Sequence, residues 1–223
     1  MSTEDKQMQY KGIIFDLDGV ICSTDEYHYL AWKALADRLG IPFDRERNNL
    51  LRGVSRMASL EIILEKSEKA YSEDEKVAFA EEKNTMYREL LGRMSPADLS
   101  DDVRDTLNVL RKAGLKLAIG SSSKNTRFIL ERIGLRDFFD AVADGNCITH
   151  SKPHPEVFLK AADMIALAPD QCVVVEDAHA GVEAAVAGGF DCAAIGDAKD
   201  DERARYHLVR ISDLISDLHI KAE

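Results

Sequence analysis

The sequence contains few cysteines, and none of them occurs in a pattern that indicates a crosslink or a metal site. The four cysteines are Cys22, Cys147, Cys172 and Cys192. None is part of a Cys-x-x-Cys pair, and no His/Cys spacing resembles a zinc site. Unpaired thiols of this kind are typical of a reducing cytosol. A disulfide or zinc framework is therefore not expected to hold this fold together.

Long apolar segments are missing as well. No apolar run approaches the roughly 20 residues that a membrane-spanning helix needs. The first residues, Met1 to Asp5, are polar and lack the apolar centre of a secretory signal. We therefore expect a cytoplasmic protein that has no membrane partner.

An excess of positive charge is also absent. The chain has 29 Lys and Arg against 40 Asp and Glu, which leaves a formal net charge of −11. Phosphate backbones are bound by clustered Lys and Arg, so a nucleic-acid partner is not expected. A small phosphorylated substrate stays compatible with this charge, because it needs only a few cations at one site or a divalent metal between acidic residues.

The chain does contain enough apolar residues for a sizeable core. Its 223 residues are 45% hydrophobic, which suits one large domain or a core with a smaller insert. No long exposed apolar helix face indicates an obligate oligomer, so we expect a monomer.

Two kinds of pattern divide the chain. Ile13-Ile14-Phe15 is typical of a strand buried on both faces. From Thr24 to Arg93 the patterns are helical, with starts at Thr24-Asp25, at Ser55 and at Ser72, which opens a capping box. The first of these helices has an apolar stripe of Leu30, Ala31, Leu35 and Leu39 and ends at Gly40.

After Ser100 strands and helices alternate. The predicted strands cover 115–119, 141–143, 173–175, 193–195 and 207–209, and the predicted helices cover 101–113, 127–133, 155–167 and 179–187. This alternation implies right-handed crossovers and a parallel sheet with helices on both faces. We predict a Rossmann-like doubly wound α/β core of residues 1–23 and 94–223, with an inserted α-helical cap domain of residues 24–93. An insert that leaves the sheet just after Asp18 can act as a lid.

The ends of the predicted strands carry polar and charged side chains that could take part in catalysis. Asp16 and Asp18 follow the first strand, Ser121 follows the second, Lys152 follows the third, and Glu176 with Asp177 follow the fourth. The carboxyl ends of parallel strands meet at one edge of a sheet, so we expect these side chains to converge. Taken alone, each of these residues is explained equally well by a turn. A calcium-binding loop is excluded for Asp16 to Asp18, because the next residues, Val20, Ile21 and Cys22, have no side-chain oxygen atoms.

The convergent residues suit phosphoryl transfer. Asp16, Glu176 and Asp177 form an acidic cluster of the kind that binds Mg²⁺. Ser121 and Lys152 can bind the oxygens of the phosphoryl group, where negative charge accumulates. Asp16 can attack phosphorus, and Asp18 can act as general acid and base. The run Gly120 to Lys124 lacks the spacing of a nucleotide-binding P-loop.

Residues of the insert have two interpretations each. His28 and Trp32 lie one helical turn apart and suit either packing or a site. Lys83 can extend its ammonium to water or point into a cleft. Arg56, in the first turn of a helix, opposes the helix dipole unless it meets an anion. The patterns leave these alternatives open.

Four motifs in order carry a family resemblance. They are Asp16-Leu17-Asp18-Gly19-Val20, Ser121, Lys152-Pro153 and Glu176-Asp177, and together they resemble those of the haloacid dehalogenase-like phosphotransferases. Within that superfamily the chain is similar to the β-phosphoglucomutases. The residues that carry this closer resemblance are Thr24, Glu26 to His28, Ala31 to Ala36, Gly53 to Arg56, Ser59-Leu60, Lys83-Asn84, Ser95 to Asp98 and Ser121 to Asn125.

The resemblance implies a role for each of these positions. Asp16 would become the phosphoaspartate, Asp18 would be the acid/base residue and give a backbone carbonyl to Mg²⁺, and Glu176 with Asp177 would complete the metal site. Ser121 and Lys152 would hold the phosphoryl group. Residues that would bind the sugar or its distal phosphate are Thr24, His28, Trp32, Gly53, Val54, Ser55, Arg56, Ser59, Lys83, Ser123, Lys124 and Asn125. The implied partners are β-glucose 1-phosphate and β-glucose 1,6-bisphosphate.

Two positions depart from that resemblance. Ser23 stands where an acidic residue is expected, and Leu99-Ser100-Asp101-Asp102 lacks an expected Pro-Gly turn. Neither change removes a catalytic group, although the first bears on the hinge of the lid. Three functions are therefore weighed: a mutase for glucose phosphates, a sugar-phosphate phosphatase, and a non-catalytic phosphate-binding module.

Overall fold

The computed structural model describes residues 10–51 and 54–220, and these form one parallel sheet with helices on both faces. The sheet has six strands in the order β3-β2-β1-β4-β5-β6 among the described residues. They are β1 (Gly12–Phe15), β2 (Lys116–Gly120), β3 (Ala141–Ala143), β4 (Cys172–Glu176), β5 (Asp191–Ala194) and β6 (Tyr206–His207). Each pairing in this order is parallel, which confirms the predicted doubly wound α/β class.

The strand order reverses at β1. This strand pairs with β2 on one side and with β4 on the other, and Phe15 is in register with both Ile119 and Val175. The next residues along these three strands, Asp16, Gly120 and Glu176, therefore emerge level with one another. In open α/β sheets the crevice at such a reversal is where ligands bind.

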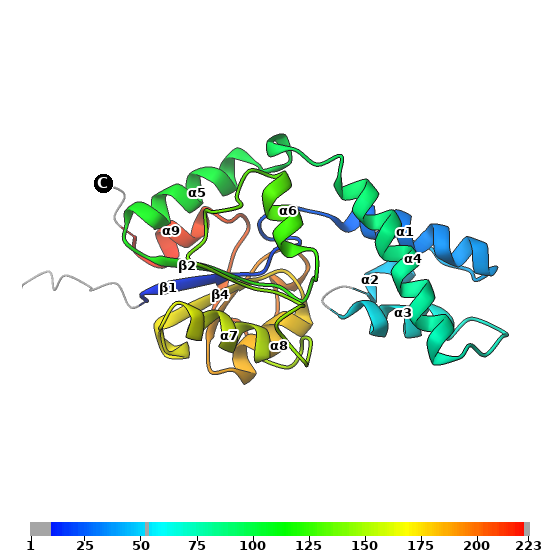
Figure 1. The fold of residues 1–223 in the computed structure, drawn as a ribbon. Helices are drawn as coiled ribbons and strands as arrows, with labels where there is room; N and C mark the ends of the chain where they lie inside the picture. Colours follow the sequence, from blue (N-terminus) through cyan, green and yellow to red (C-terminus); the bar gives the residue numbers. More distant parts are fainter. Residues whose placement is uncertain (1–9, 52–53, 221–223) are drawn as a thin grey trace, which may run out of the picture.

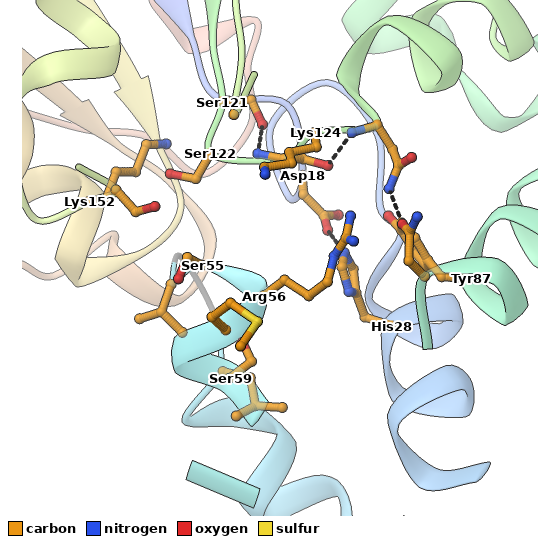
Figure 2. A pocket seen from close by; sticks show the side chains of 18 of the residues that line it. Asp18, His28, Ser55, Arg56, Ser59, Tyr87, Ser121, Ser122, Lys124 and Lys152 are labelled. Atoms are coloured by element: carbon orange, nitrogen blue, oxygen red, sulfur yellow. Dashed lines mark hydrogen bonds and ion pairs between the residues drawn. The ribbon is translucent and has the colours of Figure 1, made fainter. Parts of the chain in front are cut away.

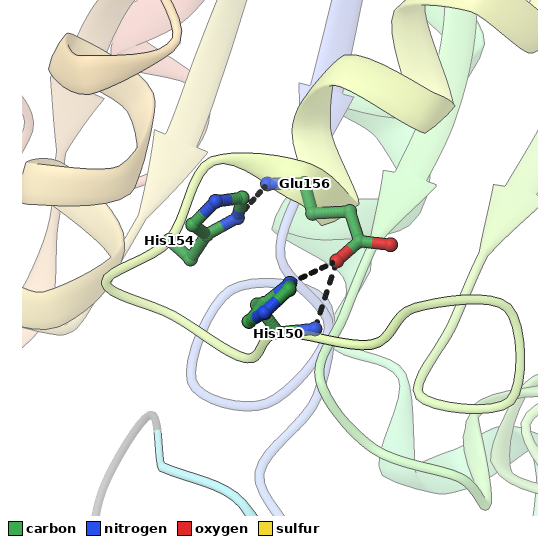
Figure 3. A group of neighbouring side chains, drawn as sticks. All are labelled: His150, His154 and Glu156. Atoms are coloured by element: carbon green, nitrogen blue, oxygen red, sulfur yellow. Dashed lines mark hydrogen bonds and ion pairs between the residues drawn. The ribbon is translucent and has the colours of Figure 1, made fainter.

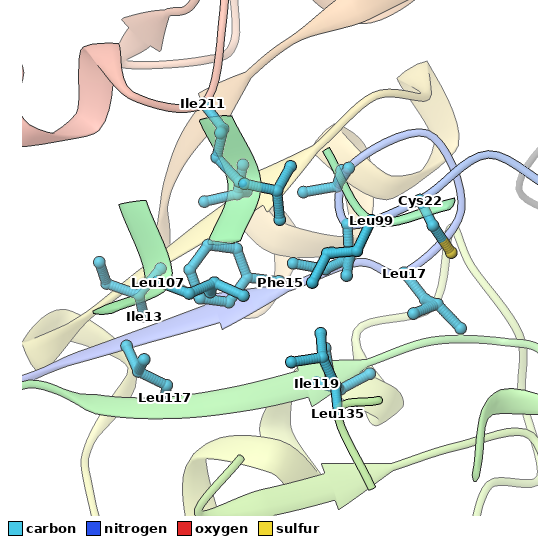
Figure 4. Close-up of a cluster of buried hydrophobic side chains, with 14 of the residues drawn as sticks. Ile13, Phe15, Leu17, Cys22, Leu99, Leu107, Leu117, Ile119, Leu135 and Ile211 are labelled. Carbon is cyan, nitrogen blue, oxygen red and sulfur yellow. The ribbon is translucent and has the colours of Figure 1, made fainter. Parts of the chain in front are cut away.

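The helices cover the sheet in two layers, each with its own apolar cluster. Helices α5 (Asp101–Lys112), α6 (Thr126–Arg132) and α9 (Asp213–Asp217) lie on one face, and α7 (Glu156–Met164) and α8 (His179–Ala187) lie on the other (Figure 1). Ile13 and Phe15 pack into the first layer with Leu107 (Figure 4), whereas Ile14 packs into the second with Phe158. This alternation follows from the two-residue period of a strand.

A separate helical group follows β1 and lies beyond the carboxyl ends of the strands (Figure 1). It contains α1 (Asp25–Leu39), α2 (Arg45–Asn49), α3 (Arg56–Leu64) and α4 (Glu73–Leu91). Trp32, Leu35, Leu60 and Ile63 are buried in a third apolar cluster within this group. The group therefore has an apolar cluster of its own, while Ala31 of α1 and Tyr87 and Leu91 of α4 join the first layer on the sheet.

The ends of these helices follow their sequence signals. The Ser55 hydroxyl accepts a hydrogen bond from the backbone N–H of Ala58 and so begins α3. Ser72 and Glu75 form the predicted capping box of α4. Gly40 adopts a left-handed conformation at φ 71°, which glycine reaches without steric cost, and ends α1. Local chemistry thus accounts for these boundaries.

Four details of the predicted elements are corrected. Leu30 was expected in the apolar stripe of the first helix but is 41% exposed, whereas Trp32 is buried. Helix α2 was not predicted, although Asp44 caps it by accepting from the N–H of Arg47. The last strand lies at Tyr206–His207 instead of 207–209, and Val209 is exposed. Helix α7 spans Glu156–Met164 and is therefore shorter than the predicted 155–167.

Candidate active site

One cavity lies between the edge of the sheet and the helical group. Its volume is about 520 Å³, and it is lined from both sides (Figure 2). The lining includes these residues predicted from the sequence: Asp16, Asp18, His28, Trp32, Val54, Ser55, Arg56, Ser59, Lys83, Ser121, Ser123, Lys124, Asn125, Lys152, Glu176 and Asp177. The tertiary structure thus brings residues that are up to 161 positions apart, Asp16 and Asp177, into one space.

Lys152 joins two carboxylates on the floor of this cavity. Its Nζ donates to Asp16 Oδ1 at 2.5 Å and to Glu176 Oε1 at 2.5 Å, and all three residues are buried. Burial by itself would lower the pKa of Lys152, but the charges of Asp16 and Glu176 raise it above its ordinary value. Lys152 is therefore a permanent cation beside the Asp16 carboxylate.

Three carboxylates cluster around this lysine. Oxygens of Asp16, Glu176 and Asp177 lie within 4.8 Å of one another. Burial, followed by repulsion from the neighbouring carboxylates, raises the pKa of Asp177 to about 9. A single lysine leaves this cluster with excess negative charge, which a divalent cation would balance. Oxygen donors of this kind fit Mg²⁺.

Two glycines make room for these carboxylates. A Cβ atom on Gly19 would lie 2.0 Å from Asp177 Oδ2, and one on Gly181 would lie 1.8 Å from Glu176 Oε1. Any side chain at either position would therefore displace a carboxylate. The close approach of backbone and carboxylate supports the fit of this cluster to a metal ion.

Thr24, the residue before α1, holds the Asp18 side chain with two hydrogen bonds. The backbone N–H of Thr24 donates to Asp18 Oδ1, and its hydroxyl donates to Oδ2, both at 2.6 Å. Desolvation raises the pKa of Asp18 to about 6, and these two hydrogen bonds oppose that rise. Thr24, which the resemblance assigns to substrate binding, is buried and is not among the residues that line the cavity, and its hydroxyl makes no helix-capping hydrogen bond.

The loop after β2 is folded by its own hydroxyls. Ser121 Oγ accepts from the N–H of Ser123, and Ser123 Oγ accepts from the N–H of Asn125, each at 3.2 Å. Ser122 Oγ is buried in the cavity wall without a hydrogen-bond partner among the described residues. A buried hydroxyl without a partner is costly, so a hydrogen bond to a ligand at this wall would be favourable.

Asn125 connects this loop to helix α4. Its Nδ2 donates to Asn84 Oδ1, and its Oδ1 accepts from Arg88 Nη1, both at 3.0 Å. The Asn125 amide thus bridges the sheet edge and the helical group, which closes one side of the cavity.

Lys83 lies on the helical side of the cavity and is only 2% exposed. Its Nζ is hydrogen-bonded to His28 Nδ1 at 2.8 Å and lies 4.6 Å and 4.4 Å from the ring centroids of Trp32 and Tyr87. Burial, followed by the charge of Arg56, lowers the pKa of Lys83 well below its ordinary value. Of the two interpretations of this lysine, the structure supports the cleft.

Arg56 enters the same space from the start of α3 (Figure 2). Its Nη1 forms an ion pair with Glu81 at 2.9 Å. Desolvation lowers its pKa, so an anionic ligand would be bound favourably here. Val54, Ser55 and Ser59 line the cavity beside it. Gly53 lies outside the described residues.

Comparison with known proteins decides the family. A model of the haloacid dehalogenase-like hydrolases matches residues 10–189. The chain belongs to this family.

Two curated relatives of the chain are named as enzymes of sugar phosphates. The chain is 39% identical over 210 residues to a β-phosphoglucomutase of Bacillus subtilis, and the match covers 93% of each chain. It is 33% identical over 184 residues to a fructose-1-phosphate phosphatase of Escherichia coli, covering 82% of this chain and 95% of the relative. The protein is therefore an enzyme of this family.

A solved haloacid dehalogenase-like structure has the same architecture. The crystal structure of β-phosphoglucomutase from Clostridium difficile matches with a TM-score of 0.88 and 35% identity, covering 94% of this chain and 97% of that one. The six-stranded sheet and the helical group thus follow an established member of the family.

Tyr87, Arg88 and Ser122 belong to the site but were not predicted as members of it. Tyr87 donates to, or accepts from, the Thr24 hydroxyl at 2.8 Å and lies against His28 with ring centroids 4.1 Å apart. Arg88 reaches Asn125 across the cavity edge. Tyr87 follows Lys83 by four positions, so the helical period was a usable signal. Arg88 offered none, because its partner is 37 residues away.

Proposed function

We propose that this enzyme is a Mg²⁺-dependent phosphomutase that interconverts β-D-glucose 1-phosphate and D-glucose 6-phosphate. The reaction would proceed through a phosphoaspartate at Asp16 and a β-glucose 1,6-bisphosphate intermediate. The similarity to β-phosphoglucomutases along nearly the whole chain supports this choice of substrate.

The observation that carries the proposal is a cavity with cations on both sides. Lys152 stands beside Asp16 at the sheet edge, while Arg56 enters from the helical group and Lys124 from the loop after β2. A mutase must bind one phosphate at the nucleophile and the other at a distance. It must also accept the bisphosphate in either orientation, and two cationic regions in one cavity suit that requirement.

Asp16 is the proposed nucleophile. Its carboxylate attacks phosphorus as the P–O bond to the sugar breaks, which leaves the phosphoryl group on Asp16. Lys152, now paired with Asp16, would bind the oxygens of the arriving phosphoryl group. Ser121 and the unpaired hydroxyl of Ser122 would donate hydrogen bonds where charge develops.

Asp18 is the proposed general acid and base. Its pKa of about 6 allows both protonation states near neutral pH. In its acid form it would give a proton to the leaving sugar oxygen. In its base form it would take the proton of the hydroxyl that attacks the phosphoaspartate next. Thr24 holds the carboxylate in place for both transfers.

The cofactor would be held by Asp16, Glu176 and Asp177, with the backbone carbonyl of Asp18 as a fourth donor. When bound, Mg²⁺ would neutralise charge on the transferring phosphoryl group. Asp16 and Glu176 also orient Lys152, so the same carboxylates would bind Mg²⁺ and position the lysine.

Residues 24–93 are proposed to act as a cap over this chemistry. The phosphoaspartate must be kept from water, and a closed cap excludes water. Asn125, Asn84 and Arg88 form a hydrogen-bonded contact between cap and core that supports this role.

A sugar-phosphate phosphatase is the second candidate. It is favoured by the similarity to named phosphatases of Escherichia coli and Thermotoga maritima, of which the second is 30% identical over 184 residues. Hydrolysis on this scaffold differs in that water attacks the phosphoaspartate. Free phosphate release from glucose phosphates or fructose 1-phosphate that exceeds isomerisation would favour this function.

A coupled assay tests the proposal. β-Glucose 1-phosphate, Mg²⁺ and a trace of glucose 1,6-bisphosphate should yield glucose 6-phosphate, with α-glucose 1-phosphate as the control substrate. An absence of glucose 6-phosphate under every priming condition would exclude the mutase.

Two variants separate the roles of the carboxylates. Asp16→Asn should abolish the phosphoenzyme, whereas Asp18→Asn should impair proton transfer and largely keep Mg²⁺ binding. An equal loss of Mg²⁺ binding in both variants would contradict this division.

The cellular location and the oligomeric state of the enzyme are also proposed. Within the described ranges, no helix combines the length and the apolar character needed to cross a bilayer. The four cysteines are free thiols, three of them buried, which suits the cytoplasm. We propose a cytoplasmic monomer, which size-exclusion chromatography with light scattering would test.

A further inference from the structure

Two histidines and a glutamate form a cluster that the proposed reaction does not use. His150 and His154 lie in the loop between β3 and α7, and Glu156 is the first residue of α7 (Figure 3). One potential ligand atom from each lies within 4.8 Å of the other two, and the two imidazole rings are 4.7 Å apart between centroids. We propose that His150, His154 and Glu156 bind a Zn²⁺ ion.

The spacing of the first two ligand atoms suits this metal. His150 Nδ1 and Glu156 Oε2 are 3.2 Å apart. Two ligand atoms of a tetrahedral zinc with bonds of about 2.0–2.1 Å are about 3.3 Å apart. Zn²⁺ would therefore take the place of the proton between this imidazole and this carboxylate, and the proton would be released to solvent.

The carboxylate is already oriented. Glu156 accepts from the backbone N–H of Thr149 at 3.0 Å and of His150 at 2.8 Å, and Lys160 pairs with its Oε1 at 3.0 Å. These bonds hold Glu156 against the loop before any metal arrives. Outer-shell partners of this kind raise the affinity of metal sites.

The third ligand, His154, already makes a hydrogen bond at the start of α7, and Zn²⁺ bound to its Nδ1 would replace that bond. His154 Nδ1 accepts from the backbone N–H of Glu156 at 3.3 Å, so its ring is turned toward the same end of α7. His150 and His154 are both exposed, which leaves their rings free to adjust and leaves room for a water molecule as fourth ligand.

The chemistry of the donors separates this site from the acidic cluster. Two imidazole nitrogens and one carboxylate are typical zinc donors, whereas Mg²⁺ prefers oxygen. The spacing His150-x-x-x-His154 also falls within the three to five residues that separate paired zinc histidines. The proposal therefore departs from our prediction that no His/Cys spacing resembles a zinc site.

Zinc titration of the full chain tests the site. Zn²⁺ is titrated against a chromophoric chelator at pH 7.5 in millimolar Mg²⁺, so that the acidic cluster is occupied by Mg²⁺. We expect one Zn²⁺ per chain. Loss of even an outer-shell partner typically weakens metal binding by about 10–100-fold, so His154→Asn and His150→Asn should each weaken it at least about tenfold.

A matched control and a second readout complete the test. His219→Asn alters an exposed histidine far along the chain and should leave zinc affinity unchanged. Co²⁺ in place of Zn²⁺ should give the intense visible absorption of a four-coordinate site in the wild type and not in His154→Asn. The proposal is overturned by an absence of stoichiometric zinc, or by zinc that excess Mg²⁺ displaces. It is also overturned by equal affinity in the wild type and both histidine variants. Because the readout is metal binding, the outcome does not depend on the mutase activity.

Discussion

The hydroxyl of Thr24 donates a hydrogen bond to the Asp18 carboxylate across 2.6 Å. Asp18 belongs to the loop that follows β1, and Thr24 is the residue before helix α1. The proposed acid/base group is thus held by the point at which the chain enters the cap. Movement of the proposed cap would therefore change the position of this carboxylate.

Thr24→Val should damage proton transfer while leaving the fold intact. A hydrogen bond to a charged group contributes about 1.5–3 kcal/mol, so kcat should fall by at least roughly tenfold. The Thr24 bonds hold the pKa of Asp18 down against desolvation. Their partial loss should raise that pKa, so the limb of the pH–rate profile near pH 6 should move to higher pH. Thr24→Ser keeps the hydroxyl and should keep the profile; superimposable profiles of Thr24→Val and wild type would contradict this role.

Gly19→Ala should weaken Mg²⁺ binding. The new methyl group would lie 2.0 Å from Asp177 Oδ2 and would displace that carboxylate. Gly114 provides a matched control, since its φ of +80° is close to the +83° of Gly19 and nothing lies within 4 Å of its missing Cβ. Both substitutions should cost about 1–2 kcal/mol of stability through backbone strain. Calorimetric Mg²⁺ titration should show at least a tenfold loss, roughly 1.4 kcal/mol, in Gly19→Ala alone.

Lys83→Met should lower activity without lowering stability. Lys83 is buried, and burial disfavours its charged form and lowers its pKa. Methionine has a similar length and carries no charge, so the melting temperature should stay equal or rise. A lost charge-assisted contact to the substrate should reduce kcat/KM by roughly 10–100-fold. Lys112→Met, at an exposed position, serves as control. A Lys83→Met enzyme with wild-type kinetics would remove Lys83 from the substrate site.

Arg88→Leu should increase hydrolysis relative to isomerisation. It removes the hydrogen bond to Asn125 and so loosens the contact between α4 and the loop after β2. More frequent opening would admit water to the phosphoaspartate. The measurement is the ratio of free phosphate to glucose 6-phosphate. Arg38→Leu breaks an ion pair with Glu82 that lies wholly within the helical group, and this variant should keep the wild-type ratio.

Asp201→Asn should flatten the acid dependence of stability. Asp201 accepts two hydrogen bonds from the Arg203 guanidinium, at 2.9 Å and 2.7 Å, and one from the Arg203 backbone N–H at 3.1 Å, and His179 Nδ1 lies 2.7 Å from its Oδ2. The Arg203 bonds hold the pKa of this carboxyl well below its usual range. Its stabilising effect is therefore present above the unfolded pKa, about 3.9, and is lost as pH falls toward the folded value.

The measurement for Asp201 is the fall in melting temperature between pH 7 and pH 3. This fall should be smaller in Asp201→Asn than in wild type. Asp105→Asn changes an exposed position on α5 and should behave as wild type does. An unchanged pH dependence in Asp201→Asn would show that another carboxyl dominates acid unfolding.

Much of the fold was predictable because its signals are local. The all-apolar run at Ile13–Phe15, the serine cap at Ser72 and the left-handed Gly40 each act within a few residues. Helix α2 was missed because it has only five residues, too few for an apolar period to become visible. Leu30 was misassigned because an apolar stripe does not reveal which of two adjacent faces meets a partner.

The members of the site divide in the same way. Asp16, Ser121, Lys152 and Glu176 could be found because parallel strands end at a common edge, so position along the chain implies position in space. The burial of Lys83 and the bonds of Thr24 to Asp18 could not be found, since each depends on how the cap helices pack against one another and against the core loop. Asn125 and Arg88 meet across the same boundary.

The sequence by itself determined the class of fold, the family and the set of groups available for chemistry, because these depend on periodicity and on short motifs. Only the tertiary structure decided which cations face the cavity, which hydroxyl supports Asp18, and that His150, His154 and Glu156 lie together. The physical reason is that burial and hydrogen bonding set the charge and the direction of a side chain. Both arise from contacts between segments that are distant in the chain.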